Sequence, residues 1–262
     1  MDLGLKDKVA LVAAASRGLG KAAAMALAKE GTKVSIFSRT EKIHDTAQEI
    51  QKETGMETLA FQADVKDSKA IEELVAATIA HFGKIDILIV NAGGPPSGSF
   101  IDLTPKDWQS AIDLTIMSAV NLCYSVVPHM IENGFGSIVA TESYSIKHPL
   151  ENLILSNSLR MAVIGMLKSM ATELGPQGIR VNSINPGWTM TERVQELMED
   201  RAARNNSTVE EEAAKVVESV PLGRMATVEE YGKTIAWLAS PAASFIHGHA
   251  LMFDGGATRA AL

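Results

Sequence analysis

The stretch that decides the fold runs from Val9 to Gly20 and reads V-A-L-V-A-A-A-S-R-G-L-G. Residues 9–13 form a short apolar run that predicts a buried strand. Gly18 and Gly20 then open an Ala-rich helix, predicted over Leu19 to Glu30. Glycines at such a turn let the backbone approach a phosphate group, which the positive N-terminus of the helix stabilises. The stretch therefore predicts the first strand and helix of an α/β domain, with a phosphate site between them.

The alternation of short β-favouring runs and longer helical patterns continues along the chain. This rhythm predicts an α/β fold with a parallel, doubly wound sheet and helices on both faces. We find no internal repeat, low-complexity tract or linker, so the sequence predicts a single domain over residues 1–262. Further strands are predicted at 32–37, 58–62, 85–91, 137–141, 180–185 and 249–253, and further helices at 68–82, 105–130 and 156–174.

A charged insertion at about residues 188–221 interrupts this rhythm. Apolar residues fall at helical spacing around Leu197 and again around Val216. We predict two short amphipathic helices that form a lid over the carboxyl ends of the strands, where sheets of this type bind ligands. The alternative is a surface excursion without a role.

Composition excludes several classes of function. The formal net charge of −7 argues against nucleic acid and against an anionic membrane surface as partners. Cys123 is the single cysteine and has apolar neighbours, so we predict no intramolecular disulfide and no metal site. The N-terminal apolar run turns into the glycine loop at once, unlike a signal peptide, and we see no apolar run of membrane-spanning length. We therefore expect a cytoplasmic protein.

Four further motifs follow the glycine loop in order: Asp64-Val65, Asn91-Ala92-Gly93, Asn185 to Thr189 (N-P-G-W-T), and His247 to Gly256. Together they resemble, over nearly the whole chain, the short-chain dehydrogenase/reductase family, in particular its 3-oxoacyl-(acyl-carrier-protein) reductase-like branch. The resemblance implies a Rossmann-type fold and an oxidoreductase that moves hydride between a nicotinamide cofactor and a carbonyl or alcohol. It also implies a set of cofactor-binding residues: Ser16, Arg17, Gly18, Leu19, Gly20, Ser38, Arg39, Asp64, Val65, Asn91, Ala92, Gly93, Pro186, Gly187 and Thr189.

The glycine loop departs from the family pattern T-G-x-x-x-G-x-G. Gly18 and Gly20 match it, but Ala13 and Ala14 stand where the family has Thr and the first glycine. The methyl group of Ala14 crowds a tight turn or requires φ values that suit alanine poorly. We expect nucleotide binding that is weakened or shifted rather than abolished.

The residues after the second strand indicate which nicotinamide dinucleotide is bound. A carboxylate at this place holds the ribose 2′-hydroxyl of NAD, whereas a basic residue favours the 2′-phosphate of NADP. Here the chain has Ser38-Arg39 and no acid, and Arg17 lies in the glycine loop. Two guanidinium groups suit a phosphate, so NADP is predicted over NAD. The alternative is two solvated surface arginines.

In the family, a Ser holds the substrate carbonyl, a Tyr donates the proton, a Lys lowers the pKa of that Tyr, and an Asn supports a water relay. Alignment without gaps places Ser143 at the Ser, Ser156 at the Tyr, Arg160 at the Lys and Asp113 at the Asn. Only the first of these catalytic residues is kept. Since an aliphatic hydroxyl is a much weaker acid than a phenol, Ser156 is a poor proton donor. Arg160 keeps the positive charge of Lys but differs from it in shape and hydration.

The altered residues suggest a hypothesis, a bidentate ion pair between Asp113 and Arg160. The alternative is two independent replacements in a relaxed pocket. Water or His148 is left as the proton source, because histidine titrates near neutrality. Tyr144 would point away from the site if the alternation of the strand continued. Glu142 is interpreted as a charge at the end of a strand.

Two functional interpretations stay open. The first is an NADP(H)-dependent oxidoreductase with altered proton delivery, acting on a small-molecule carbonyl or acyl substrate. The second is a catalytically inactive nucleotide- or metabolite-binding regulatory protein on the same scaffold, with a purely structural partner as a weaker third. The resemblance also implies a homotetramer or homodimer assembled through the helices at 105–130 and 156–174.

Overall fold

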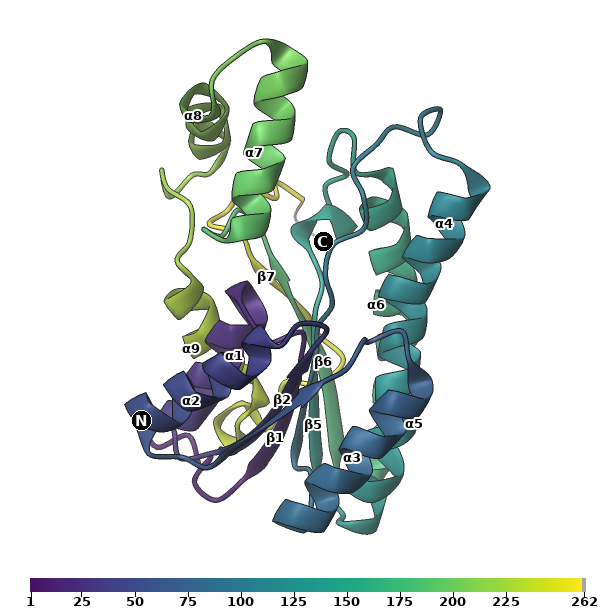
Figure 1. The fold of residues 1–262 in the computed structure, drawn as a ribbon, viewed down its shortest axis with the longest axis vertical. Coiled ribbons are helices and arrows are strands. Elements are labelled where there is room, and N and C mark those ends of the chain that lie inside the picture. The colour runs from purple at the N-terminus through teal and green to yellow at the C-terminus, as the bar shows by residue number, and fades with distance from the viewer. Residues whose placement is uncertain (261–262) are drawn as a thin grey trace.

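The computed structural model describes residues 1–260, which contain one seven-stranded parallel sheet (Figure 1). The strands lie in the order β3-β2-β1-β4-β5-β6-β7, so the chain starts near the middle and winds first to one edge and then to the other. The predicted fold class, a doubly wound parallel sheet, is confirmed. The strands are β1 (Val9–Ala13), β2 (Lys33–Ser38), β3 (Thr58–Gln62), β4 (Ile87–Val90), β5 (Gly136–Thr141), β6 (Ile179–Pro186) and β7 (Ala250–Phe253).

Helices cover both faces of the sheet, with an apolar core on each side. The helices are α1 (Gly18–Lys29), α2 (Lys42–Thr54), α3 (Ser68–Phe82), α4 (Pro105–Ile112), α5 (Ser118–Glu132), α6 (Ile154–Leu174), α7 (Glu192–Asn205), α8 (Val209–Ser219) and α9 (Val228–Ala239). One core joins α1, α2 and α9 to the sheet around Ile36 and Tyr231. The other joins α3, α5 and α6 around Leu88 and Val126.

The observed elements agree with the predicted ones to within one or two residues at most ends. Two helices, α2 and α9, were not predicted. α2 is mostly polar, and α9 contains Gly232, which weakens a helical pattern. The packing requires that glycine, because a Cβ there would lie 2.6 Å from the carbonyl oxygen of Ala22. Gly232 thus lets α9 pack directly on α1.

The helix predicted at 105–130 is interrupted. A π-helical turn, Asp113–Met117, separates α4 from α5, and such turns are frequent at functional sites. Thr115 is buried in this turn, and its hydroxyl has no hydrogen-bond partner among residues 1–260. The helical periodicity of residues 105–130 does not indicate the extra residue of the π-helical turn.

The same segment, Pro105–Glu132, is long and apolar enough to cross a membrane by length and composition. The expectation that no run approaches that length is therefore wrong. In the fold, Leu122 and Val126 of this segment are fully buried in the core between α3, α5 and the sheet. The segment packs as a core helix of an α/β protein.

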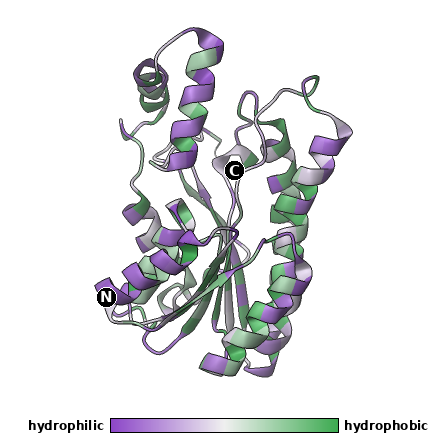
Figure 2. Ribbon diagram, in the orientation of Figure 1, coloured by the Kyte–Doolittle hydropathy of each residue, from purple (hydrophilic) through white to green (hydrophobic). Residues whose placement is uncertain are grey.

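The helices α7 and α8 stand over the carboxyl ends of the strands, where the lid was predicted (Figure 1). Thr191 and Thr208 cap them by accepting backbone hydrogen bonds from the first turns. Their inner faces place Met198 and Val216 against the buried ring of Trp188. The outer surface of α7 is mostly hydrophilic, as expected for an amphipathic helix (Figure 2).

Candidate active site

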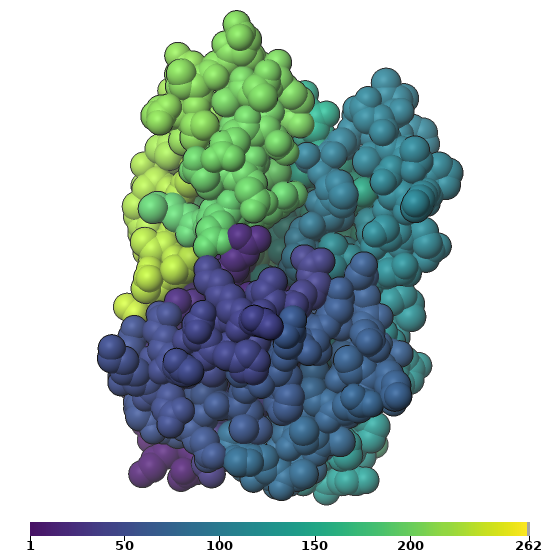
Figure 3. Space-filling model, in the orientation of Figure 1, coloured from purple at the N-terminus to yellow at the C-terminus, as the bar shows by residue number. Residues whose placement is uncertain are grey.

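A cleft of about 810 Å³ opens at the carboxyl ends of the strands, between the lid and the loop that follows β4 (Figure 3). Ligands of doubly wound sheets bind at this edge. All the site residues predicted from the sequence line the cleft except Asp64 and Asp113. The fold therefore brings the glycine loop and the segment around Ser143 into one space, while the role of each residue stays a prediction.

The glycine loop forms its turn despite the alanine. Ala14 has a φ of +50°, in the left-handed region that favours glycine. At Gly20 a Cβ would lie 2.4 Å from the carbonyl oxygen of Ala14, so only glycine fits. Asn91 Nδ2 donates a hydrogen bond to the carbonyl oxygen of Ala13 at 3.2 Å. This contact ties the end of β4 to the loop and keeps the turn in place.

The N-terminus of α1 is suited to a phosphate. Its N-cap residue, Arg17, makes no side-chain hydrogen bond to the first turn, and that turn carries no acidic residue. The backbone N–H groups at this end of the helix are therefore left for a ligand. The residues present thus fit the diphosphate of a dinucleotide.

Basic side chains line the cleft beside this helix, as predicted for the 2′-phosphate of NADP. Arg17, Arg39 and Lys42 all line it, next to the buried Ser38 at the end of β2. Asp64 does not, because its carboxylate accepts a hydrogen bond from the backbone of the following loop. Its neighbours in the chain line the cleft instead.

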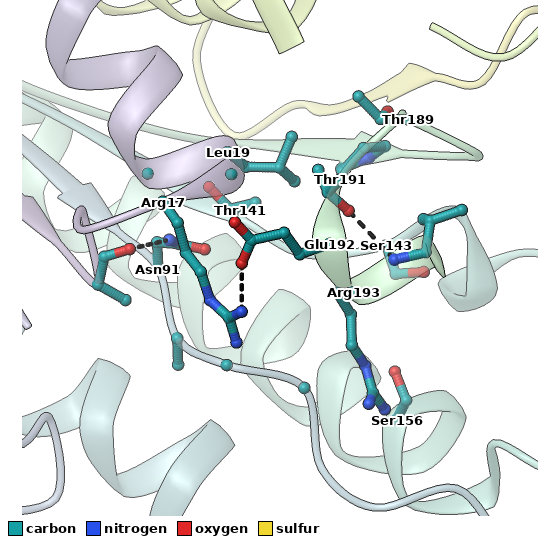
Figure 4. A pocket seen from close by; sticks show the side chains of 18 of the residues that line it. Arg17, Leu19, Asn91, Thr141, Ser143, Ser156, Thr189, Thr191, Glu192 and Arg193 are labelled. Atoms are coloured by element: carbon teal, nitrogen blue, oxygen red, sulfur yellow. Dashed lines mark hydrogen bonds and ion pairs between the residues drawn. The ribbon is translucent and has the colours of Figure 1, made fainter. Parts of the chain in front are cut away.

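Arg17 is engaged with the lid. Its guanidinium forms an ion pair with Glu192 of α7 (Figure 4) and lies 3.7 Å from Glu196. Lys42 Nζ lies 3.9 Å from the same Glu192 carboxylate. The hydrogen bond from Arg17 lowers the pKa of Glu192. Because all four side chains are largely exposed, these ion pairs are weak and another anion can replace the carboxylate.

Three residues aligned with the family's catalytic residues lie at the other end of the cleft: Ser143, Ser156 and Arg160. Ser156 and Arg160 lie one turn apart on α6, and Arg160 Nε donates to Ser156 Oγ at 3.0 Å. Arg160 Nη1 donates to the carbonyl oxygen of Thr141 at 3.2 Å. Ser143 follows β5, and its hydroxyl oxygen accepts the backbone N–H of Ser145 at 3.1 Å. The guanidinium is thus fixed across the end of β5.

Glu142 is the partner that sequence reasoning missed. Its side chain is only 4% exposed, lines the cleft, and lies 3.2 Å from Arg160 Nη1. Burial raises the pKa of Glu142 to about 7, although the positive charge of Arg160 opposes this change. The protonated form of Glu142 is therefore favoured more than that of a free carboxyl group. An acid directly before Ser143, at the end of an apolar strand, was the available signal.

The hypothesis of an Asp113–Arg160 ion pair is wrong. Asp113 accepts a hydrogen bond from Gln109, one turn earlier, and Arg160 pairs with Glu142 instead. The π-helical turn is the physical reason, because it shifts which side chains face inward. Thr115, two residues on, is the buried one.

Tyr144 lines the cleft, so the expectation that it points away from the site is wrong: β5 ends at Thr141, and the alternation of the strand does not continue to Tyr144. Tyr144 is buried, and its ring lies 6.3 Å from those of Trp188 and His148. Burial raises the pKa of Tyr144 to about 12, which makes its phenol a poor acid at neutral pH. His148 lines a second, smaller cavity and not the cleft. The structure therefore does not bring His148 together with Ser143.

The turn after β6 completes the cleft with Pro186, Gly187 and the buried Thr189. A Cβ on Gly187 would lie 2.9 Å from the side chain of Asp254, so the closing segment of the chain packs on this turn. Thr191, which sequence reasoning did not select, also lines the cleft and caps α7. Its place before a predicted helix was the signal for the cap.

The fold and the site together define a class of protein, the dinucleotide-dependent α/β oxidoreductases. The defining features are a parallel doubly wound sheet, a glycine loop before α1, and a serine after β5 in the same cleft. The chain belongs to the short-chain dehydrogenase/reductase family of NAD(P)-dependent oxidoreductases. The family model described as Enoyl-(Acyl carrier protein) reductase matches residues 13–258.

Two relatives illustrate the match. The chain is 32% identical over 254 residues to dehydrogenase/reductase SDR family member 4 of Oryctolagus cuniculus, covering 97% of this chain and 94% of the relative. It is 30% identical over 254 residues to a 3-oxoacyl-[acyl-carrier-protein] reductase of Staphylococcus epidermidis, covering 95% of this chain and 98% of the relative. The similarity to the 3-oxoacyl reductase branch is confirmed.

Solved structures of the family share the whole fold. L-sorbose reductase from Gluconobacter frateurii, complexed with NADPH and L-sorbose, is 29% identical with a TM-score of 0.94, over 99% of this chain and 100% of that one. An NAD⁺-bound xylitol dehydrogenase is 27% identical with a TM-score of 0.92, over 96% of this chain and 99% of that one. Similar proteins of this fold thus bind either dinucleotide.

Proposed function

We propose that this protein is an NADP(H)-dependent oxidoreductase that interconverts a carbonyl and an alcohol in a small-molecule or acyl substrate, with a proton source different from the family's tyrosine. The observation that carries the proposal is the shared cleft, in which the glycine loop, Ser143 and the Arg160–Glu142 pair line one space. The complex of L-sorbose reductase with NADPH supports the choice of cofactor.

A bound nicotinamide cofactor would supply or accept the hydride. This chain supplies the binding groups. The N–H groups at the start of α1 would hold the diphosphate, and the guanidiniums of Arg17 and Arg39 would hold the 2′-phosphate. The turn at 186–189 closes the other end of the cleft, where the family resemblance assigns the nicotinamide amide.

Proton delivery follows from the groups at the end of β5. Ser143 donates its hydroxyl hydrogen to the substrate carbonyl oxygen and so polarises the C=O bond. As hydride adds to the carbon, the positive charge of Arg160 stabilises the oxygen that becomes negative. Glu142 then gives its proton to that oxygen, and the carboxylate left behind lies 3.2 Å from Arg160 Nη1. Oxidation of the alcohol runs these steps in reverse.

The first test is a fluorescence titration of the purified protein with NADPH and with NADH. We expect NADPH to bind at least about tenfold more tightly, equivalent to ~1.4 kcal/mol, because two guanidiniums face the 2′-phosphate. Arg39→Gln should weaken binding of NADPH and leave NADH unchanged, whereas Lys233→Gln, which removes an exposed cation of α9, should change neither. Absence of binding of both nucleotides at millimolar concentration would refute the proposed cofactor.

A second candidate function is a regulatory protein that binds the nucleotide without turnover. One observation favours it: Ser156 offers only an aliphatic hydroxyl, already bonded to Arg160, where the family has its phenol. A panel of small carbonyl compounds with NADPH separates the two. Turnover of any compound supports the oxidoreductase, and tight nucleotide binding with no turnover across the panel supports the regulator.

We also propose that the protein forms a homotetramer or homodimer through α5 and α6. Apolar side chains are exposed on these helices, including Tyr124 (79% exposed) and Met161 (49%). Burying such side chains against a second copy is favourable. Light scattering in solution measures the mass of the assembly, and Tyr124→Lys should reduce it.

A further inference from the structure

A second cavity, of about 350 Å³, lies beneath the lid beside the cleft. Tyr144, Leu150 and Trp188 line both spaces, so the cleft and the second cavity adjoin along these side chains. The two aromatic side chains are buried, and their rings pack edge to face. A substrate with its carbonyl at Ser143 therefore has the second cavity beside it, along a largely aromatic border.

Two arginines of α7 give the second cavity a positive wall. Arg201 is half-buried and its guanidinium carbon lies 4.8 Å from the centre of the Trp188 ring. Arg204 follows it by just under one helical turn and lines the same cavity. Within residues 1–260 neither arginine takes part in an ion pair, so both guanidiniums keep their hydrogen-bond donors for a ligand.

The acidic side chains of the cavity do not neutralise these arginines. Glu212 accepts hydrogen bonds from Lys215 at 2.6 Å, Ser207 at 2.7 Å and Asn205 at 3.1 Å. The bond from Lys215, followed by the other two, lowers the pKa of Glu212 to about 2, so this carboxylate stays ionised and balances Lys215. Glu151, at the rim, is exposed to solvent. The cavity thus keeps a net positive charge.

The charged side chains of α7 face two different spaces. Glu192, in its first turn, faces Arg17 of the glycine loop, whereas Arg201 and Arg204 lie toward its far end. Arg17 therefore meets carboxylates of α7, whereas the two residues of α7 with charged side chains that line the second cavity are both arginines. A chain with a formal net charge of −7 that gathers unpaired cations at one cavity selects for an anion there.

We propose that the second cavity is a subsite for a carboxylate or phosphate group at the far end of the substrate. The substrates are then anionic carbonyl compounds whose apolar middle segment lies along Tyr144 and Trp188. Guanidinium groups bind both anions through paired hydrogen bonds, which matches Arg201 and Arg204. The assignment of the carbonyl end rests on the proposed function, but binding of the anion requires neither cofactor nor turnover.

The test is isothermal titration calorimetry of the whole protein, without nucleotide, against benzoate, phenyl phosphate and the neutral benzamide. We expect one or both anions to bind and benzamide to bind at least tenfold more weakly. The two anionic probes distinguish a carboxylate site from a phosphate site. The double variant Arg201→Gln/Arg204→Gln should lose at least tenfold in affinity for the anion, and Lys233→Gln should lose nothing. Equal binding of benzamide, or an unchanged double variant, would overturn the proposal.

Two further measurements keep the result specific. A guanidinium in the last turn also stabilises a helix end, so the melting temperature of each variant is measured as a control for folding. The variant Arg201→Lys keeps the positive charge but removes the planar fork of the guanidinium. If Arg17→Gln rather than the double variant abolishes anion binding, the anion occupies the glycine loop and the proposal fails. Once a turned-over compound is known, a keto acid should show a lower KM than its methyl ester, and the double variant should remove that difference.

Discussion

At the scale of single residues, the proton chemistry of the cleft depends on Glu142. If this carboxyl is the acid, Glu142→Gln should slow carbonyl reduction about 10²- to 10⁴-fold, the usual contribution of a general acid. Since burial raises its pKa to about 7 and the protonated form is the donor, the reduction rate of the parent should fall as the pH rises through 7. Rates measured against pH under saturating NADPH check both expectations.

The matched control for this change is Asp113→Asn, which makes the same replacement on a carboxylate outside the cleft. It should leave the rate and its pH dependence unchanged. NADPH affinity should stay the same in both variants, because Glu142 donates a proton and is not placed at the cofactor's phosphates. A Glu142→Gln protein with the parent's rate and pH profile would remove the carboxyl from the mechanism.

At the scale of elements, the glycine loop has a strained backbone at Ala14 and a position, Gly20, where only glycine fits. Ala14 holds a φ of +50°, which costs an alanine roughly 1–3 kcal/mol, part of which glycine recovers. Ala14→Gly should therefore raise the free energy of unfolding by about 1 kcal/mol and strengthen NADPH binding several-fold. Gly20→Ala should do the opposite, because its Cβ would meet the Ala14 carbonyl oxygen at 2.4 Å. Urea unfolding and the NADPH titration measure both.

A glycine in open space serves as the reference for these loop variants. Gly165 lies within α6, and a Cβ there meets nothing within 4 Å. Gly165→Ala should be neutral or slightly stabilising, by up to about 1 kcal/mol, since alanine is the better helix former. Similar effects of Gly165→Ala and Gly20→Ala would show that the loop geometry does not matter.

The sequence was sufficient for the elements whose signals are local. The strands, the glycine loop and the two lid helices follow from apolar spacing and turn residues, which need no knowledge of distant contacts. The π-helical turn at Asp113–Met117 could not be predicted, because it adds a residue to the helix without any change of periodicity. Nor could the Arg160–Glu142 pair, since it joins α6 to the end of β5 and depends on burial in the finished fold.

At the scale of the whole molecule, the lid and the cofactor compete for one guanidinium. Glu192 of α7 pairs with Arg17, the same side chain that the 2′-phosphate of NADP would use. Glu192→Gln should therefore strengthen NADPH binding about three- to tenfold at low salt. The gain should shrink at high salt, where exposed ion pairs are screened. Fluorescence titration at two salt concentrations measures the change.

A loss of one negative charge anywhere on the lid would also favour an anionic nucleotide. Glu218→Gln on α8 provides the comparison, because it removes the same charge from an exposed side chain that lies outside the cleft. It should change NADPH affinity much less than Glu192→Gln does. Equal gains in the two variants would mean that the ion pair to Arg17 has no special effect.

The three contacts that hold Arg160 also decide how this site can be redesigned. Its guanidinium bonds at once to Ser156, to the Thr141 backbone and to Glu142. Replacing Arg160 by lysine alone would give up the planar fork, and removing the Glu142 carboxylate alone would leave a guanidinium without its counter-charge. Introducing the family's Tyr and Lys thus needs several substitutions together. An engineer who wants the family's proton donor in this scaffold must redesign positions 142, 156 and 160 as one unit.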